Sequence, residues 1–434
     1  MKIITWNVNG IRTLKSVDCV LNELSADIAC FQETKVSRSQ IPENTALIEG
    51  YTSYFSYPRK HSGYSGVATY CKDTFVPEDA EEGLSSTVLT ENYEPLTHVL
   101  SFSEYFNNDA EKFDFEGRVI ITYHLMKYED QIQRLAIINV YCPHVDPEKP
   151  ERYLYKMQFS LMLEAKLKEL SETGCSVVIL GDLNIAYSVI DHCQPCEERE
   201  FNSSKSRQWL KALLTSEISF CDGMVHKIGI VDAFRHFYPD KKESYTCWNT
   251  KTGARATNYG TRIDYILVTS NLLPLLDSCE ILSDYHGSDH CPVAAIFKCD
   301  SIPQENVQLP SICTRLWPEF SGQQQKLQAF FQKIQNVADN LMKQQETELQ
   351  SFQLKLFNQL IHNLKNCNET SGFSCSPSDS SSSSSSSKHE DSSIDDEQIK
   401  SVAIMKKNQS EAWKTMLAGP PKPPLCSGHQ KNVF

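Results

Sequence analysis

Short runs of β-branched and aliphatic residues alternate with stretches of helical periodicity between Lys2 and about Asp300. The apolar runs predict β-strands, and the two longer periodic stretches predict helices at residues 152–170 and 203–214. The predicted strands are KIITWN, ADIACFQ, YSGVATYC, RVIITYHL, RLAIINVYC, SVVILGD, SYTCW, RIDYILV and PVAAIFK. Strands this numerous and this apolar predict an α/β fold in which two sheets pack together with helices outside them.

The pattern changes beyond residue 300 and predicts four further segments. Residues 301–322 are expected to form a linker, and residues 323–366 carry apolar positions at helical spacing, which predicts a long amphipathic helix. Residues 367–411 include the uninterrupted serine run Ser380 to Ser387 in an acidic, aromatic-poor stretch, and such a composition predicts disorder. Residues 412–434 form the last segment.

Composition narrows the classes of function. The net charge is -13, which is opposite in sign to that of a general nucleic-acid coat, so binding of DNA or RNA would depend on a local basic patch or a metal ion. Many of the 16 cysteines lie inside apolar runs, which favours a reducing compartment. The N-terminus has no secretory pattern, and no apolar window approaches the length of a membrane span.

Polar side chains that could carry chemistry stand at the ends of predicted strands or, for Asp264, inside one, and for Asp289 and His290, just before one. They are Asn7, Glu33, Tyr141, Asp182, Asn184, Asp264, Asp289 and His290. Ligands often bind at strand ends, because loops there carry polar groups on a rigid base. The carboxylates and amides are hard oxygen donors without accompanying cysteines, a set that favours Mg²⁺ or Mn²⁺ over Zn²⁺. This pattern suits metal-assisted phosphoryl chemistry.

Each of these motifs alone has a simpler interpretation. Gly-Asp-Leu-Asn at 181–184 is often a tight turn, Asp289 and His290 could cap a strand, and Asp264 could be a core hydrogen-bond partner. Taken together at successive strand ends, the motifs favour a common site.

The order of motifs resembles a known family. WNVNGIR (6–12), QETK (32–35), SGYSGVA (62–68), GDLN (181–184), RIDY (262–265) and SDHCPV (288–293) resemble the exonuclease III branch of apurinic/apyrimidinic (AP) endonucleases, within the endonuclease/exonuclease/phosphatase superfamily. The resemblance covers residues 1–300, which would be the catalytic domain. It implies a four-layer sandwich of two packed mixed β-sheets flanked by helices, and Mg²⁺-dependent hydrolysis of DNA phosphodiesters in base excision repair, with Mn²⁺ as a substitute.

The resemblance also implies roles for single residues. Asn7 and Glu33 would hold the metal with help from Asp289, and Asp182, Asn184 and His290 are further candidate ligands. Asp182 would orient and deprotonate the attacking water, and Asn184 would place water or stabilise the transition state. Tyr141 and His290 would bind the scissile phosphate of the DNA, while Asp264 orients His290. Asn9 stands where close relatives can carry aspartate.

The lining of the DNA sugar pocket departs from that of relatives dedicated to abasic sites. Where those relatives carry bulky aromatics, this chain has Cys247 and Thr261. Smaller groups should hold a flipped abasic sugar less firmly. We therefore expect 3′-5′ exonuclease and 3′-phosphodiesterase activity with weaker abasic-site incision.

The C-terminal third resembles eukaryotic members of this branch that carry a GRF-type zinc finger. TRLWPEFSG (314–322) is similar to their segment after the catalytic domain, and residues 412–429 look like the start of the finger. Cys426 and His429 are two candidate ligands, whereas structural zinc needs four, so we expect an incomplete finger without zinc. Gln324, Leu327, Phe330 and Phe331 match a sliding-clamp-binding peptide, although any amphipathic helix produces the same spacing.

Two weaker signals lie after GDLN. HCQPC (192–196) has zinc-like local spacing but lacks an evident fourth ligand nearby, which favours a loop near the DNA. Lys205 and Arg207 could contact backbone phosphates or simply begin a solvated helix.

Other functions remain open at this point. One alternative is a different phosphoesterase of the same superfamily, such as an inositol phosphatase, a sphingomyelinase or a deadenylase. Another is a clamp-binding scaffold with little activity. We expect a monomer in the nucleus, with cytoplasmic and mitochondrial residence as alternatives.

Overall fold

The computed structural model describes residues 1–59, 63–87, 97, 110–145, 148–194, 196–215, 217–219, 227–302, 308–321, 354–355 and 357–359. The chain divides into two units, Met1–Leu341 and Met342–Phe434. In the second unit, residues 354–355 and 357–359 are helical. The segments expected to bind a clamp (Gln324 to Phe331), to be disordered (367–411) and to begin a zinc finger (Cys426 and His429) lie outside the described residues.

Two sheets form the centre of the first unit. One has the strand order β14-β15-β1-β2-β4-β3, and it consists of β1 (Lys2–Asn7), β2 (Ile28–Gln32), β3 (Tyr51–Ser56), β4 (Val67–Lys72), β14 (Leu276–Ile281) and β15 (Val293–Phe297). The other has the order β16-β6-β7-β8-β13-β10-β9, with β5 also paired to β6. Its strands are β5 (Asp79–Glu82), β6 (Val119–Tyr128), β7 (Gln131–Tyr141), β8 (Ser176–Asp182), β9 (Glu217–Ser219), β10 (Lys227–Asp232), β13 (Asp264–Thr269) and β16 (Asp300–Ser301).

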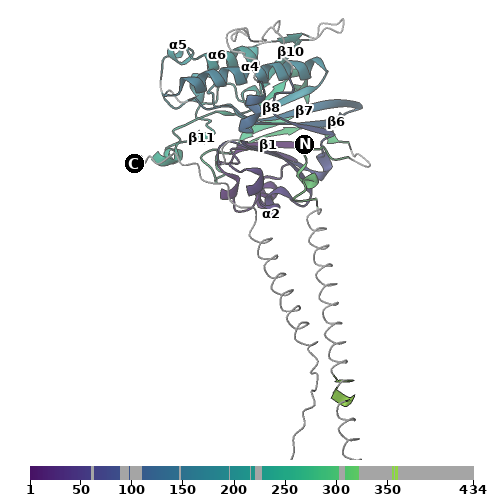
Figure 1. Cartoon of the computed structure of the whole chain (residues 1–434). Coiled ribbons are helices and arrows are strands. Elements are labelled where there is room, and N and C mark those ends of the chain that lie inside the picture. The colour runs from purple at the N-terminus through teal and green to yellow at the C-terminus, as the bar shows by residue number, and fades with distance from the viewer. Residues whose placement is uncertain are drawn as a thin grey trace, which may run out of the picture. The chain divides into compact units, whose positions relative to one another are not determined.

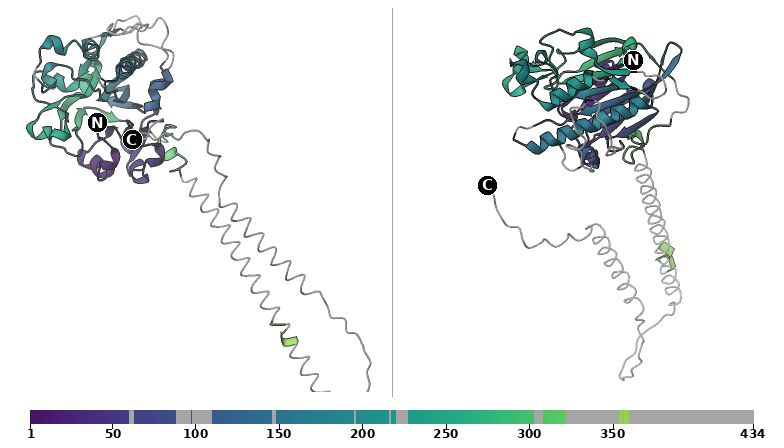
Figure 2. Two further views of the ribbon diagram at one scale, coloured as in Figure 1. Left: turned by 60° about the vertical axis from the view of Figure 1, so that its left-hand side comes forward. Right: turned by 90° about the horizontal axis from the view of Figure 1, so that it is seen from above.

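Helices cover the outer faces of both sheets (Figure 1). The α-helices are α1 (Val17–Leu24), α2 (Glu43–Ala46), α4 (Pro150–Glu172), α5 (Glu198–Phe201), α6 (Lys205–Thr215) and α7 (Ala233–Phe237). Helices α4 and α6 lie over the sheet that contains β6, β7 and β8, and Figure 2 shows these layers from two further directions. Among the described residues, none of the helices combines the length and apolar character that crossing a membrane requires.

Three hydrophobic layers separate these elements, and strand alternation explains them. Along β1, Ile3 faces the other sheet and packs in a cluster with Ile137 and Val178, whereas Ile4 faces outward. The outward side packs against Leu21 of α1, and on the far side of the molecule the second sheet buries its other face against α4 and α6. The expected four-layer α/β sandwich is therefore confirmed.

Several elements, among them α1, β10 and β14, were not predicted from the sequence, and two further segments show why. β3 was not predicted because YTSYFS is rich in Ser and Thr, yet it is fully buried. Residues 308–321 of the expected linker pack on this strand: Thr314 Oγ1 lies 2.7 Å from Ser53 Oγ, and Cys313 forms a bridge with Tyr54. The buried Ser53 hydroxyl thus finds a partner in a segment far away in sequence.

Candidate functional site

The polar residues predicted at strand ends meet at one edge of the two sheets. Asn7 ends β1 and Glu33 follows β2, which runs parallel to β1. Asp182 ends β8, and Asp264, at the start of the antiparallel strand β13, lies opposite it in register. Parallel strands end at the same edge, and an antiparallel partner begins there, so the topology gathers these side chains.

Asn7 connects the two sheets at this edge. Its Nδ2 donates to Oε1 of Glu33 and to Oδ2 of Asp182, each across 2.9 Å, and its side chain is fully buried. The Asn7 amide therefore links two carboxylates: Glu33, which follows a strand of one sheet, and Asp182, which ends a strand of the other.

Asp182, Asp264 and His290 form a compact buried group beside Asn7. Nδ1 of His290 lies 2.8 Å from Oδ2 of Asp264, and its Nε2 lies 4.0 Å from Oδ2 of Asp182. One ligand atom from each of the three residues lies within 4.8 Å of those from the other two. Burial disfavours the imidazolium of His290, but the Asp264 carboxylate outweighs burial and raises the pKa of His290 well above its ordinary value.

Burial opposes ionisation of the carboxylates at this edge, and a bound cation would offset that cost. Burial, together with the charge of Asp264, raises the pKa of Asp182 to about 7. Burial also opposes ionisation of Glu33, but hydrogen bonds from Asn7 and Lys35 outweigh it and lower the pKa of this carboxyl. In addition, Oδ1 of Asp264 is buried without a partner among the described residues. Such a hard-oxygen donor set fits a divalent cation.

Left-handed backbone conformations place several of these groups. Glu33 has φ 51° and Asn184 has φ 52°, values that non-glycine residues adopt rarely and mostly at constrained functional positions. In Asn184, the backbone N donates to Oδ1 of Asp182 (2.8 Å) and Nδ2 donates to the carbonyl of Cys142 (3.0 Å). Gly181 has φ 138°, and a Cβ there would lie 1.9 Å from the Val140 carbonyl oxygen, so the GDLN turn requires glycine.

Tyr141 ends β7 next to the carboxylates. Burial and the negative charges of Glu33 and Asp182 raise the pKa of its phenol, which therefore stays protonated and can donate a hydrogen bond. The guanidinium of Arg118 lies over its ring at 4.6 Å from the centroid, and Arg118 Nη1 donates to the Tyr141 carbonyl across 2.9 Å.

Sequence reasoning missed the cluster around Arg118. Arg118 is buried, and its Nη2 donates to the hydroxyl of Tyr64 (2.8 Å), as does Nη2 of Arg152 (2.9 Å). Glu116 pairs with both guanidinium groups at 2.6 Å. The sequence does show an arginine, Arg118, directly before the apolar run VIITYHL, and a tyrosine, Tyr64, in SGYSGVA. It does not show that these two residues are in contact, because they lie far apart along the chain.

The other predicted residues lie outside the group formed by Asp182, Asp264 and His290. Cys247 and Thr261 face each other in the two-stranded sheet of β11 (Cys247–Trp248) and β12 (Gly260–Thr261), and Cys247 also forms a bridge with His290. Asp289 is half-buried, and its Oδ1 accepts from Ser288 Oγ, so a metal-binding role for it stays a prediction. His192, Cys193 and Cys196 of HCQPC do not form a metal-binding group with any other described residue.

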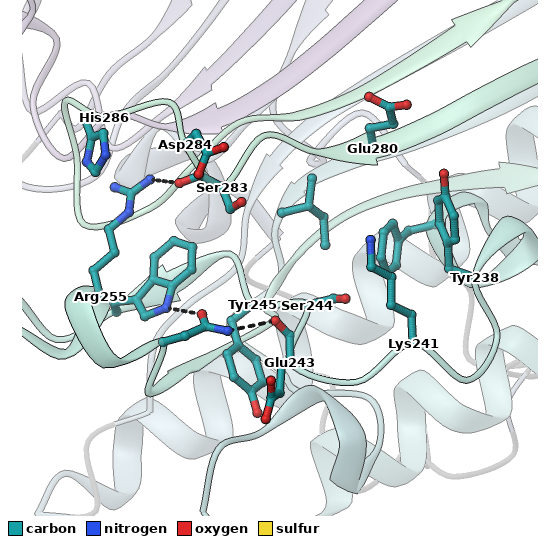
Figure 3. A pocket seen from close by; sticks show the side chains of 14 residues that line it. Tyr238, Lys241, Glu243, Ser244, Tyr245, Arg255, Glu280, Ser283, Asp284 and His286 are labelled. Atoms are coloured by element: carbon teal, nitrogen blue, oxygen red, sulfur yellow. Dashed lines mark hydrogen bonds between the residues drawn. The ribbon is translucent and has the colours of Figure 1, made fainter.

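A cavity of about 600 Å³ opens beside β11 (Figure 3). Its lining includes Tyr245, Trp248, Arg255 and Asn258, and Trp248 Nε1 donates to Asn258 Oδ1 across 3.1 Å. The predicted catalytic and metal-binding residues are not part of this lining, so this cavity is distinct from the strand-end site.

Comparisons with known proteins agree with this geometry. A model of the Endonuclease/Exonuclease/phosphatase family matches residues 4–290. The chain is 36% identical over 476 residues to the DNA-(apurinic or apyrimidinic site) endonuclease 2 of Xenopus laevis, covering 99% of this chain and 90% of that protein. It is 33% identical over 299 residues to an exodeoxyribonuclease of Bacillus subtilis, covering 68% of this chain and 99% of that protein. The crystal structure of the Xenopus laevis APE2 catalytic domain superposes with a TM-score of 0.66 at 42% identity, covering 75% of this chain and all of that one.

Proposed function

Because the chain belongs to the endonuclease/exonuclease/phosphatase family and is a DNA repair nuclease of its exonuclease III branch, we propose that it hydrolyses DNA phosphodiesters with a divalent metal ion, Mg²⁺ or Mn²⁺. The observation that carries this proposal is the hydrogen bonding of Asn7 to Glu33 and Asp182, opposite the pair formed by His290 and Asp264. This arrangement offers oxygen ligands on one side and hydrogen-bond donors for a phosphate on the other.

Glu33 and the side-chain oxygen of Asn7 would hold the metal ion, with Asp289 as a further candidate. When bound, the ion would neutralise charge that develops on the phosphate oxygens. The hydrogen bond from Lys35 to Glu33 is then one of several contacts that keep this carboxylate ionised and ready to bind a cation.

The protein's own residues supply the remaining steps. Asp182, with its pKa raised to about 7, can accept a proton from a water molecule near neutral pH. Asn184 is fixed beside it and can position that water. The imidazolium of His290 and the phenol of Tyr141 both carry protons that can be donated to phosphate oxygens.

Two small residues, Cys247 next to His290 and Thr261 next to Cys247, support a preference among DNA substrates. Cys247 and Thr261 are small, so the surface next to the phosphate site lacks the aromatic walls that would hold a flipped abasic sugar. We propose that 3′-5′ exonuclease and 3′-phosphodiesterase activities exceed abasic-site incision. We also propose that the protein acts in the nucleus. It would bind a sliding clamp through four residues, Gln324, Leu327, Phe330 and Phe331.

The test uses the purified full chain on three duplex substrates: one with a mismatched 3′ end, one with a blocked 3′ end and one with an internal abasic site. We expect cleavage that chelation by EDTA abolishes and that added Mg²⁺ restores, with the two 3′ ends processed faster. Absence of cleavage on all three substrates in Mg²⁺ and in Mn²⁺ would reject the proposal. Incision of the abasic site at the fastest rate would reject the substrate preference alone.

A further inference from the structure

His192 belongs to a row of side chains that begins at the catalytic His290. Thr261 pairs with His192 on one side and with Cys247 on the other, and Cys247 in turn pairs with His290. We call these four residues, His192, Thr261, Cys247 and His290, the ladder. Directly opposed residues in a sheet project to the same face, so His192 presents its side chain on the same face as His290.

Backbone hydrogen bonds define the ends of the ladder. Cys193 N donates to the Gly260 carbonyl (3.0 Å) and Arg262 N donates to the Asp191 carbonyl (2.8 Å), which makes His192 and Thr261 a non-hydrogen-bonded pair. Cys247 and His290 form a second non-hydrogen-bonded pair. Here Trp248 N donates to the Asp289 carbonyl (2.9 Å), and Cys291 N donates to the Thr246 carbonyl (2.8 Å). Side chains of such pairs lie close together, and the cross-strand steps separate the Cα atoms of His192 and His290 by roughly 15 Å.

The two central residues of the ladder have small side chains, and the residue farthest from His290 has a large one. Cys247 and Thr261 are small and half-buried, whereas His192 places an aromatic ring beyond them. If the scissile phosphate lies at His290, a sugar would lie over Cys247 and Thr261, and a base attached to that sugar would extend toward His192. The surface is therefore suited to a complete nucleotide more than to a bare sugar.

The imidazole of His192 is held in a defined state. Nδ1 accepts a hydrogen bond from Gln194 N (3.0 Å), which leaves the proton on Nε2, and among the described residues Nε2 has no recorded hydrogen-bond partner. Burial lowers the pKa of His192, and the charge of Arg207 acts in the same direction, so the ring is neutral at physiological pH. A neutral ring stacks on a base without needing a counter-charge.

The surroundings of His192 also suit a nucleic-acid strand. Its ring packs edge-on against Phe201, with 6.2 Å between centroids, and Arg207 lies over the other ring at 3.8 Å. Arg207 Nη1 donates to the Phe201 carbonyl, and no ion pair of Arg207 is recorded within the described part of the chain. Arg207 thus places a cation next to an aromatic ring, the combination that proteins use to bind single-stranded nucleic acid.

We propose that His192 is a specificity-determining residue that packs its ring against the base of the 3′-terminal nucleotide while the scissile phosphate lies at His290. This inference rests on the proposed function, because it assumes that a 3′-terminal nucleotide is a substrate. It assigns His192 a role in choosing the leaving nucleotide and none in the hydrolytic step.

The test compares two duplexes that are identical except at the 3′-terminal residue, which carries a base in one and is an abasic tetrahydrofuran residue in the other. With the full chain and Mg²⁺, His192→Ala should lower kcat/KM on the base-bearing end about tenfold, through KM, and change that on the abasic end by less than about twofold. His192→Phe should keep most of the wild-type preference, because it keeps a ring. Gln194→Ala is the matched control, since the backbone and not the side chain of Gln194 contacts His192.

Three other results of this experiment would contradict the proposal. Equal losses on both ends in His192→Ala, or no loss on either, would overturn the role of His192 while leaving the nuclease assignment intact. If His192→Ala does not fold, a His192→Phe protein that is folded and has lost the preference for a base would overturn it as well. A wild-type protein that degrades neither duplex would overturn the proposed function and this inference together.

Discussion

Nδ1 of His290 donates to Oδ2 of Asp264 across 2.8 Å, and this bond sets both the orientation and the charge of the imidazole. The same carboxylate oxygen accepts from Thr246 Oγ1 at 2.6 Å, so Asp264 is itself fixed. Nε2 of His290 is thereby directed toward Asp182, 4.0 Å away. The proposed phosphate-binding role of His290 therefore depends on a residue that need not touch the substrate.

Asp264→Asn should lower kcat by about a hundredfold or more, because the imidazolium loses the charge that stabilises it and the hydrogen bond that orients it. Single-turnover cleavage of a 3′-mismatched duplex in Mg²⁺ measures this loss. Asp277→Asn is a matched control, because Asp277 forms an exposed ion pair with Lys298 and should retain activity. Equal activity of Asp264→Asn and the wild type would contradict the role assigned to Asp264.

Asp182→Ala should abolish Mg²⁺-dependent cleavage and leave folding intact. The carboxylate is placed to take the proton of the attacking water, so its loss should cost roughly a thousandfold or more in kcat. Stability should change little, because the loss of the hydrogen bonds from Asn7 and Asn184 is offset by removing a carboxyl whose ionisation is opposed by burial and by Asp264. Cleavage rates and thermal unfolding curves of the two proteins give both answers, and wild-type-like nuclease activity of the variant would refute the assignment.

Cys247→Phe should raise abasic-site incision relative to 3′-5′ trimming. An aromatic ring beside His290 would add the apolar wall that the sugar pocket lacks, and one buried ring typically contributes a few kcal/mol or less, so we expect a gain of about five- to fiftyfold in the ratio. The measurement is the ratio of kcat/KM on an internal abasic site to that on a 3′-mismatched end. An unchanged ratio in a folded variant would show that Cys247 does not set the preference.

Most central strands and the two longest helices were predictable because periodicity is local. VVILGDLN reads as a buried strand followed by polar groups, and β8 ends at Asp182 as expected. Contacts between distant segments were not predictable in this way. The bond from Arg118 to Tyr64 and the packing of Thr314 on Ser53 depend on how the sheets assemble, and buried polar residues such as those of β3 look exposed in sequence until their partners are known.

Arg262 shows the same limit, because RIDY does not reveal that its arginine is buried between two carboxylates. Nε lies 2.8 Å from Asp191 and Nη1 lies 2.7 Å from Asp232, with all three side chains nearly inaccessible to solvent. Arg262→Met should lower the free energy of unfolding by about 3–5 kcal/mol, since it leaves buried charge uncompensated. Arg38→Met removes an exposed pair with Glu319 and should cost about 1 kcal/mol or less in the same denaturation experiment. Similar losses in both variants would contradict the buried-pair argument.

His124, in β6, gives the protein a defined sensitivity to acid. Burial lowers the pKa of this imidazole from its ordinary value of 6.5 to about 3, and its Nε2 lies 2.9 Å from Thr122 Oγ1. Between these two values the unfolded chain binds a proton at His124 and the folded chain does not. The free energy of unfolding must therefore fall as the pH falls through this window.

Protonation of His124 in the unfolded chain, where its pKa is about 6.5, should lower the free energy of unfolding by about 2 kcal/mol between pH 7.5 and pH 5. His124→Gln cannot take up this proton, so its loss between the two pH values should be smaller than that of the wild type by this amount. Guanidinium denaturation of both proteins at both pH values isolates the effect, because the carboxyl groups titrate alike in the two chains. Parallel losses in the two proteins would show that His124 is protonated as readily in the folded chain as in the unfolded one.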